Sequence, residues 1–137
     1  MRIRSPRLTI AQQARQIDRL FPHFTYCRAK NIPTWRGTLQ PTDSSPAYVV
    51  KVSYRQPKSP KVWVLSPKLR PDAPHRYPDG SLCLYYPRDL SWTPNAFIAE
   101  TIIPWTALWL ACYELWLCTG EWYGPEAPHG SGKKRSV

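Results

Sequence analysis

The feature that most limits how this chain can fold is a proline-studded stretch from Ser66 to Asn95. Proline cannot continue a helix or donate to a sheet, so no long helix or central strand can cross this stretch. Its aromatic residues argue against disorder, and an ordered loop of this length in a compact domain is usually functional. We therefore expect one long functional loop between two regularly folded parts.

The residues before the loop begin with helical periodicity. Between residues 7 and 20, apolar side chains recur every three or four positions, with Arg and Gln between them. This spacing predicts a helix with one apolar face. Thr9 or Ser5 is expected to cap the helix, and Pro22 is expected to end it.

The period then changes to that of strands. Short segments rich in Tyr, Val, Trp and Thr, separated by Pro, Asp and Ser, cover residues 24–30, 34–40, 47–55 and 61–65. Such segments predict a four-stranded antiparallel meander. The alternation is clearest in the third strand, whose predicted common face carries Tyr48, Val50, Val52 and Tyr54.

The residues after the loop are mostly apolar. Residues 94–101 are expected to form a short helix, and a longer helix is expected to begin near Pro104 and to end near Gly120. Tryptophan, leucine and cysteine occur all around this second helix, which predicts burial of most of its surface. As a membrane span it would be short and would contain Pro104 and Glu114, so we expect no membrane insertion.

Length and charge limit the class of protein. The 137 residues are enough to bury one core, and we expect a single domain over residues 1–130 with a disordered basic tail at residues 131–137. The formal net charge of +10 favours acidic partners, either nucleic acid or an acidic protein surface. A solvated basic surface with no such partner would have the same composition.

The four cysteines are Cys27, Cys83, Cys112 and Cys118. None of them forms a C-x-x-C pair, so we expect neither a zinc site nor a disulfide framework, and no cofactor. The N-terminus lacks the continuous apolar segment of a signal peptide, and a reducing cytoplasm fits free thiols best. Cys112 and Cys118 fall in the predicted apolar helix, where an inert buried thiol is expected.

Cys83 differs from the other cysteines because it follows a turn inside the long loop. The stretch HRYPDGSLCLYYP, residues 75–87, places Pro78, Asp79 and Gly80 just before it, a pattern typical of a tight exposed turn. Asp79 is expected to form this turn rather than to transfer protons. The thiol is therefore expected to be presented rather than hidden.

Four short motifs, taken in order, resemble those of the ubiquitin-conjugating enzymes. The matching residues are Trp35, Thr38, Pro41, Asp43 and Ser44; Tyr54, Pro57, Pro60, Lys61 and Val62; Gly80, Leu82, Cys83 and Leu84; and Trp92, Thr93 and Pro94. The resemblance covers roughly residues 35–110 and rests on the shared order and near-matching spacing. It implies an α+β fold with an N-terminal helix, a four-stranded antiparallel meander, a long active-site loop and C-terminal helices.

The departures from the family pattern narrow the resemblance. The asparagine that the family has eight residues before its cysteine is His75 here, preceded by Pro74. The stretch HRYPDGSLCLYY and the C-terminal half resemble bacterial members encoded beside cGAS-like nucleotidyltransferases in CBASS antiphage operons. In those systems the nucleotidyltransferase looks like the ubiquitin substitute and is joined through its C-terminus.

The resemblance implies that Cys83 carries the C-terminus of such a modifier as a thioester and passes it to a lysine. A thiolate suits this chemistry because it is both a nucleophile and a good leaving group. His75 is the second implied catalytic residue. Its ring could donate to the developing oxyanion, stabilise the thiolate or act as a base.

Further side chains are accessory candidates. Asp89 and His129 could reach the site only if their segments fold back towards it. Trp92, with Tyr85 or Tyr86, is expected to be exposed and to line the thioester groove. The tryptophans at helical spacing are expected to be core residues.

The implied partners are the C-terminus of a cGAS-like nucleotidyltransferase, a lysine-bearing protein target and a separate activating enzyme or a substitute for one. An activating partner is implied because the chain has no glycine-rich phosphate loop, and the basic helix at residues 7–20 is its expected docking face by analogy. Two alternatives stay open. One is an inactive binding module of the same fold, although inactive relatives typically lack the cysteine. The other is a basic nucleic-acid-binding protein that stacks bases on Trp and Tyr.

Overall fold

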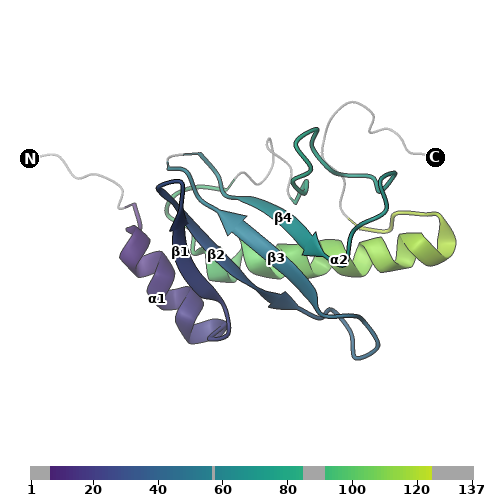
Figure 1. Ribbon diagram of the computed structural model, residues 1–137, viewed down its shortest axis with the longest axis horizontal. Coiled ribbons are helices and arrows are strands. Elements are labelled where there is room, and N and C mark those ends of the chain that lie inside the picture. Colours follow the sequence, from purple (N-terminus) through teal and green to yellow (C-terminus); the bar gives the residue numbers. More distant parts are fainter. Residues whose placement is uncertain (1–6, 57, 85–91, 125–137) are drawn as a thin grey trace, which may run out of the picture.

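The computed structural model describes residues 7–56, 58–84 and 92–124 (Figure 1). The elements follow in the order α1 (Ile10–Leu20), β1 (Thr25–Ala29), β2 (Ile32–Leu39), β3 (Tyr48–Ser53), β4 (Lys61–Ser66), the 3-10 helix η1 (Ile98–Glu100) and α2 (Ile102–Thr119). In Figure 1, α2 runs behind the sheet and α1 lies beside β1. This arrangement confirms the expected α+β fold of an N-terminal helix, a four-stranded antiparallel sheet and C-terminal helices.

The strands form one antiparallel sheet in the order β1-β2-β3-β4, as the meander predicts. On β3 the predicted alternation is confirmed, because Tyr48, Val50 and Val52 are buried while the residues between them are half-buried. Gly37 on β2 lies directly under the Phe24 ring, and a Cβ atom there would lie 2.2 Å from a ring carbon. Glycine is therefore required at this position, since a side chain would displace the ring from the core.

The first helix begins later than predicted, at Ile10, and its cap is Thr9 rather than Ser5. The Gln12 N–H donates to Thr9 Oγ1 at 3.0 Å, and the Thr9 N–H donates to Gln12 Oε1 at 2.8 Å. This reciprocal pair satisfies two N–H groups that have no partner within the helix. It therefore fixes where α1 starts.

A buried glutamine joins α1 to the chain just before α2. Gln13 is fully buried, and its Nε2 donates to the Ala96 carbonyl at 2.9 Å while its Oε1 accepts from the Ile98 N–H at 2.8 Å. Both ends of the amide are thus satisfied, as a buried polar group requires. This side chain therefore fixes α1 against the segment that contains Ala96 and Ile98.

The second long helix has the predicted ends but not the predicted burial. Pro104 lies in its first turn, and Gly120 caps it in the left-handed conformation with φ of 80°. The expectation that α2 is buried on most of its surface is wrong, since Leu108 and Leu115 are 48% and 49% exposed. One side of α2 packs on the sheet, and among the described residues nothing covers the opposite side.

The exposed side of α2 raises the question of whether this helix could enter a membrane, which the sequence argues against. By length and composition, residues 98–119 could cross a membrane, and 39% of the most apolar window is buried inside the structure. A core helix of a compact domain passes the same test. The buried side of α2, which includes Trp109, Leu110 and Tyr113, belongs to the same core as the β3 residues.

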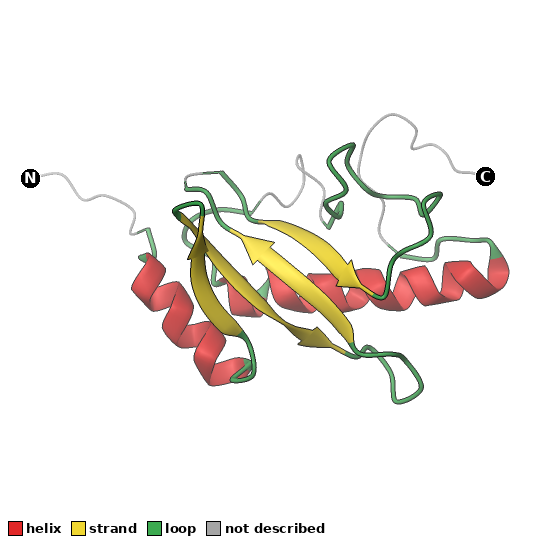
Figure 2. Ribbon diagram, in the orientation of Figure 1, coloured by secondary structure: helices red, strands yellow, loops and turns green. Residues whose placement is uncertain are grey.

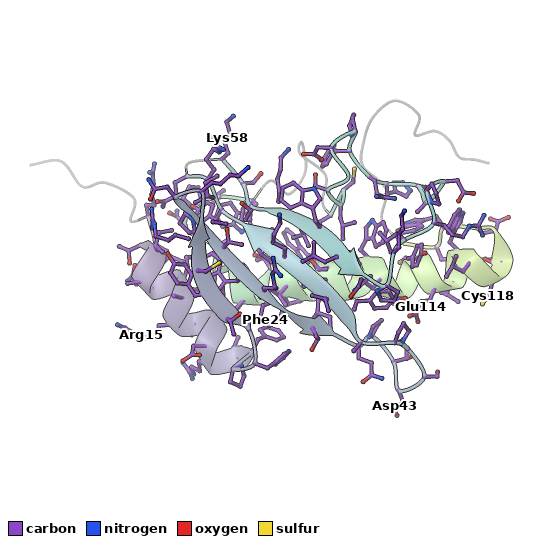
Figure 3. The ribbon with its side chains drawn as sticks, in the orientation of Figure 1. Arg15, Phe24, Asp43, Lys58, Glu114 and Cys118 are labelled. Atoms are coloured by element: carbon purple, nitrogen blue, oxygen red, sulfur yellow. The ribbon has the colours of Figure 1, made fainter. Side chains whose placement is uncertain are left out.

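Glu114 is the only charged residue of α2, and it binds the chain between β2 and β3. Its carboxylate oxygens accept hydrogen bonds from the Ser45 and Tyr48 hydroxyls, each at 2.7 Å. Figure 3 shows Glu114 close to the base of the loop that carries Asp43. Burial, followed by the bond to Glu114, raises the pKa of Tyr48. The contact ties the far end of α2 to the sheet.

We expect Glu114→Ala to lower the free energy of unfolding by about 1–3 kcal/mol, because it leaves two part-buried hydroxyls without their acceptor. Glu114→Gln keeps one carbonyl acceptor and should cost less. Urea denaturation followed by circular dichroism measures both. Glu121→Ala is the matched control, because Glu121 is exposed just beyond α2, and it should change the value by less than about 0.5 kcal/mol. Equal losses in the two alanine variants would contradict the role of Glu114.

Candidate active site around Cys83

The chain before Cys83 forms a small hairpin within the long loop between β4 and α2 (Figure 2). Arg76 and Leu82 face each other as an antiparallel bridge, and the Tyr77 N–H donates to the Ser81 carbonyl at 2.8 Å. Gly80 closes the turn with φ of 90°, a conformation that favours glycine. Asp79 Oδ1 accepts from the Ser81 N–H at 2.9 Å and from its hydroxyl at 2.6 Å. The predicted turn role of Asp79 is therefore confirmed.

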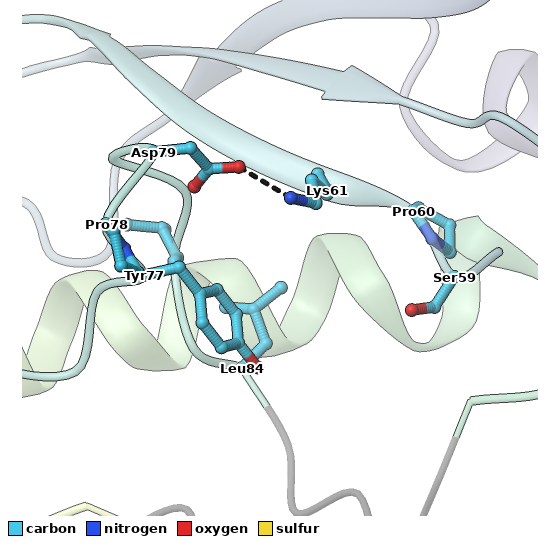
Figure 4. Close-up of a pocket in the computed structure, with 8 residues that line it drawn as sticks. Ser59, Pro60, Lys61, Tyr77, Pro78, Asp79 and Leu84 are labelled. Atoms are coloured by element: carbon cyan, nitrogen blue, oxygen red, sulfur yellow. Dashed lines mark hydrogen bonds and ion pairs between the residues drawn. The ribbon is translucent and has the colours of Figure 1, made fainter.

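The hairpin is fastened to β4. Asp79 forms an ion pair with Lys61, drawn as a dashed line in Figure 4, and its carbonyl accepts from Trp63 Nε1 at 3.0 Å. The Leu82 N–H donates to the Val62 carbonyl at 2.9 Å. The hydrogen bond from Lys61, with those from Ser81, lowers the pKa of the Asp79 carboxyl. Asp79 is thus a structural anion, held in place by a cation of the neighbouring strand.

His75 and Cys83 lie opposite each other where the hairpin begins and ends. The Cys83 N–H donates to the His75 carbonyl at 2.9 Å, and the indole N–H of Trp109 donates to the same oxygen at 3.1 Å. His75 has a φ of 59°, in the left-handed region, which histidine and asparagine adopt more readily than most residues. Because both residues tolerate this backbone conformation, histidine can occupy the position at which the ubiquitin-conjugating enzymes have asparagine.

The Cys83 thiol is half-buried, so the expectation that it is presented rather than hidden holds only in part. Burial raises the pKa of Cys83, a hydrogen bond from the Tyr77 side chain lowers it, and the nearby charge of Asp79 raises it. Because burial is the largest of these effects, the thiol form is favoured at rest. Sequence reasoning missed Tyr77, since only the register of the hairpin brings its hydroxyl to the sulfur.

An open pocket of about 460 Å³ lies beside the hairpin (Figure 4). It is lined by Ser59, Pro60, Lys61, Tyr77, Pro78, Asp79, Leu82 and Leu84. The two leucines flank Cys83 in the chain, and Tyr77 is the residue that bonds to its sulfur. The pocket wall is largely apolar, with the ion pair of Lys61 and Asp79 on it. The two chain neighbours of Cys83 therefore border a space large enough for the side chains of a bound peptide.

One of the accessory candidates differs from the sequence expectation, and four others cannot be compared with it. Trp92 is not exposed: it is 7% exposed, packs edge-on against Tyr54 and donates from Nε1 to Thr101 Oγ1 at 3.1 Å. The Trp92 indole is thus part of the apolar core, and the expectation that it lines the groove is wrong. The other accessory candidates lie outside the described residues: Asp89, His129, Tyr85 and Tyr86.

The remaining cysteines are also free thiols. Cys112 is buried, as expected, and burial raises its pKa. Cys118 is exposed near the end of α2 (Figure 3), so the expectation of a buried thiol is wrong there, because it lies on the uncovered side of the helix. Cys27 is exposed on the edge strand β1. Within residues 7–56, 58–84 and 92–124, no three His, Cys, Asp or Glu side chains gather as metal ligands.

Comparison with known proteins agrees with this geometry. The family model of the type II CBASS E2 protein matches residues 13–130, a range that includes the sheet, the hairpin with Cys83 and α2. No curated protein matches the chain. Because the family match spans well over half of the 137 residues, the chain belongs to the type II CBASS E2 proteins, a ubiquitin-conjugating-like family that works with other CBASS components.

Proposed function

We propose that this protein carries the C-terminus of a ubiquitin-like partner as a thioester on Cys83 and transfers it to a lysine. One observation carries the proposal: in a chain of the E2 family, Cys83 ends a hairpin that is fixed to β4, and its neighbours Tyr77, Leu82 and Leu84 line an open pocket. Of the four cysteines, Cys83 alone is partly buried, and the Tyr77 side chain forms a hydrogen bond to its sulfur.

The proposed chemistry has two steps. In charging, the Cys83 thiolate attacks the activated carbonyl of the partner's C-terminus, and the activating group leaves as the new C–S bond forms. In discharge, a neutral lysine amine attacks the thioester carbonyl, the C–S bond breaks, and its electron pair returns to the Cys83 sulfur as a thiolate. The amine loses a proton to solvent or to a base, leaving an amide.

The proposed partners follow from the family and from the surface. A cGAS-like nucleotidyltransferase supplies the C-terminal tail, and the largely apolar pocket beside Cys83 takes apolar side chains of that tail. An activating enzyme, or a substitute for one, docks on α1, whose exposed side carries Arg15 and Arg19. The transfer takes place in the cytoplasm and supports antiphage defence.

The first prediction is a thioester adduct. Co-expression with the neighbouring genes should give a higher-mass form on non-reducing gels, which thiol reductants remove. Cys83→Ala should abolish the adduct, and Cys83→Ser should trap it as an ester that resists reductants. Cys27→Ser and Cys118→Ser are the matched controls, because both thiols are exposed, and they should leave the adduct unchanged. An adduct that survives Cys83→Ala would contradict the proposal, and the absence of any adduct in the wild-type protein would favour an inactive binding module.

The second prediction concerns pH. Because burial raises the pKa of Cys83, its thiolate fraction should still be rising above pH 8. Its alkylation by iodoacetamide, followed by peptide mass spectrometry, should therefore accelerate about tenfold per pH unit between pH 7 and 8.5. Tyr77→Phe removes a hydrogen bond that stabilises the thiolate and should slow alkylation several-fold at each pH in this range. A plateau below pH 8, or no effect of Tyr77→Phe, would show that the sulfur is not held in this way.

The third prediction concerns His75. His75→Ala should slow discharge onto free lysine by about tenfold or more, while charging changes less. His75→Asn keeps both a hydrogen-bond donor and a residue type that tolerates the left-handed backbone, so it should discharge faster than the alanine variant. His75→Gly relieves the backbone but removes the ring. If the glycine variant discharges at the wild-type rate, the ring has no part in the reaction.

A further inference from the structure

The chain after α2 returns to the site through Trp122. Its ring packs against the His75 ring, with centroids 4.8 Å apart, and against Trp109, with centroids 5.2 Å apart. His75 and Trp109 are the two residues joined by the carbonyl that also holds the Cys83 N–H. Trp122 is therefore packed against the same structural unit that positions the sulfur.

Cys83 and Trp122 line one small cavity of about 20 Å³. Its other lining residues are Leu84, Trp105, Leu108, Trp109 and Cys112. A cavity of this volume holds roughly one water-sized group. The wall is built almost wholly from apolar and aromatic side chains, so an oxygen atom placed there would depend on indole N–H groups for hydrogen bonds.

The indole N–H of Trp122 is a donor that is available to bond to such an oxygen. Its Nε1 is buried and has no hydrogen-bond partner among the residues that the structure describes, whereas Nε1 of Trp109 is already bonded to the His75 carbonyl. A buried donor without an acceptor is unfavourable and rare in native proteins. An acceptor that arrives only during the reaction would give this N–H its missing partner.

The indole nitrogen is also held tightly by the chain that follows. A Cβ atom on Gly124 would lie 3.3 Å from Trp122 Nε1 and 2.3 Å from Cys112 Sγ, so only glycine fits this close approach. The ring is thus enclosed by His75, Trp109 and the backbone at Gly124. A fixed donor is worth more to a developing charge than a mobile one, because it needs no reorganisation at the moment of reaction.

We propose that the Trp122 indole N–H donates a hydrogen bond to the carbonyl oxygen of the Cys83 thioester as it becomes an oxyanion. This inference rests on the proposed function and names a catalytic residue for it. When the amine nitrogen bonds to the carbonyl carbon, the C=O π electrons move to oxygen, where the indole N–H stabilises them. They return as the C–S bond breaks and the thiolate leaves. The indole keeps its proton throughout, and His75 is the positioning residue that braces the ring.

The test uses a synthetic acyl donor, acetyl-leucyl-glycine as its mercaptoethanesulfonate thioester, with the full-length protein and free lysine as acceptor. Trp122→Phe keeps an aromatic ring against His75 but removes the N–H, and it should slow discharge about 100-fold. Trp116→Phe is the matched control, because Trp116 packs on α2 against Tyr113 and Arg70 instead, and it should discharge at the wild-type rate. Alkylation of Cys83 by iodoacetamide creates no oxyanion and should be equal in all three proteins.

The outcomes separate this inference from the proposed function. If the wild-type protein forms no thioester on Cys83 with the probe, the proposed function fails. If the thioester forms and Trp122→Phe discharges it at the wild-type rate, the inference is overturned and the proposed function stands. Slower discharge accompanied by equally slower alkylation would assign Trp122 a packing role only and also overturn the inference.

A second measurement needs no variant of Trp122. Acetyl-leucinal should add to the Cys83 thiolate and give a thiohemiacetal, whose oxygen lies where the oxyanion would. In ¹⁵N-tryptophan-labelled wild-type protein, the Trp122 indole proton resonance should move downfield on this addition, because a new hydrogen bond forms. The Cys83→Ala protein should show no such change. An unmoved resonance in the wild-type adduct would overturn the inference.

Discussion

The site depends on one carbonyl oxygen, that of His75. It accepts the Cys83 N–H from the far arm of the hairpin and the Trp109 indole N–H from α2. The oxygen can serve both because a carbonyl has two lone pairs, and it is turned to face them by the left-handed backbone at His75. The loop with the thiol is thereby attached to Trp109, a core residue of α2. If this carbonyl moved, Cys83 would lose the hydrogen bond that fixes its position relative to Trp109 and, through it, to Trp122.

The chain holds its reactive loop with polar contacts at one end and apolar contacts at the other. At the turn, Asp79 is bound by Lys61 and Ser81, so the hairpin cannot slide along β4. At the thiol, burial among aromatic rings suppresses ionisation, and the Tyr77 hydroxyl offsets part of that suppression. The sulfur is therefore kept neutral at rest yet remains close to a donor that favours the anion. In the transfer that we propose, the sulfur acts first as nucleophile and then as leaving group, and this balance suits both roles.

Much of this fold could be predicted from the pattern of residues, because local rules and tertiary packing agree in most elements. The alternation of β3, the Asp-Gly turn and the glycine cap of α2 all follow from short-range chemistry, and the structure contains each of them. Trp92 could not be placed in this way, since aromatic side chains near a turn suit a groove and a core equally well. The exposed side of α2 was missed because an apolar sequence does not reveal how many faces have a partner. Tyr77 and Trp122 were missed because the register of the hairpin brings Tyr77 to the sulfur, and the chain after α2 brings Trp122 to the cavity that Cys83 lines. Neither placement follows from a sequence period.

The partial burial of Cys83 also affects how fast its thiol can be oxidised. Peroxide reacts with cysteine through the thiolate, so a thiol that is held protonated is oxidised to sulfenic acid only slowly. The same aromatic enclosure that delays ionisation therefore shields the sulfur from chemical damage while no partner is bound. The free Cys83 thiol would therefore be lost to oxidation more slowly than an exposed thiol of ordinary pKa.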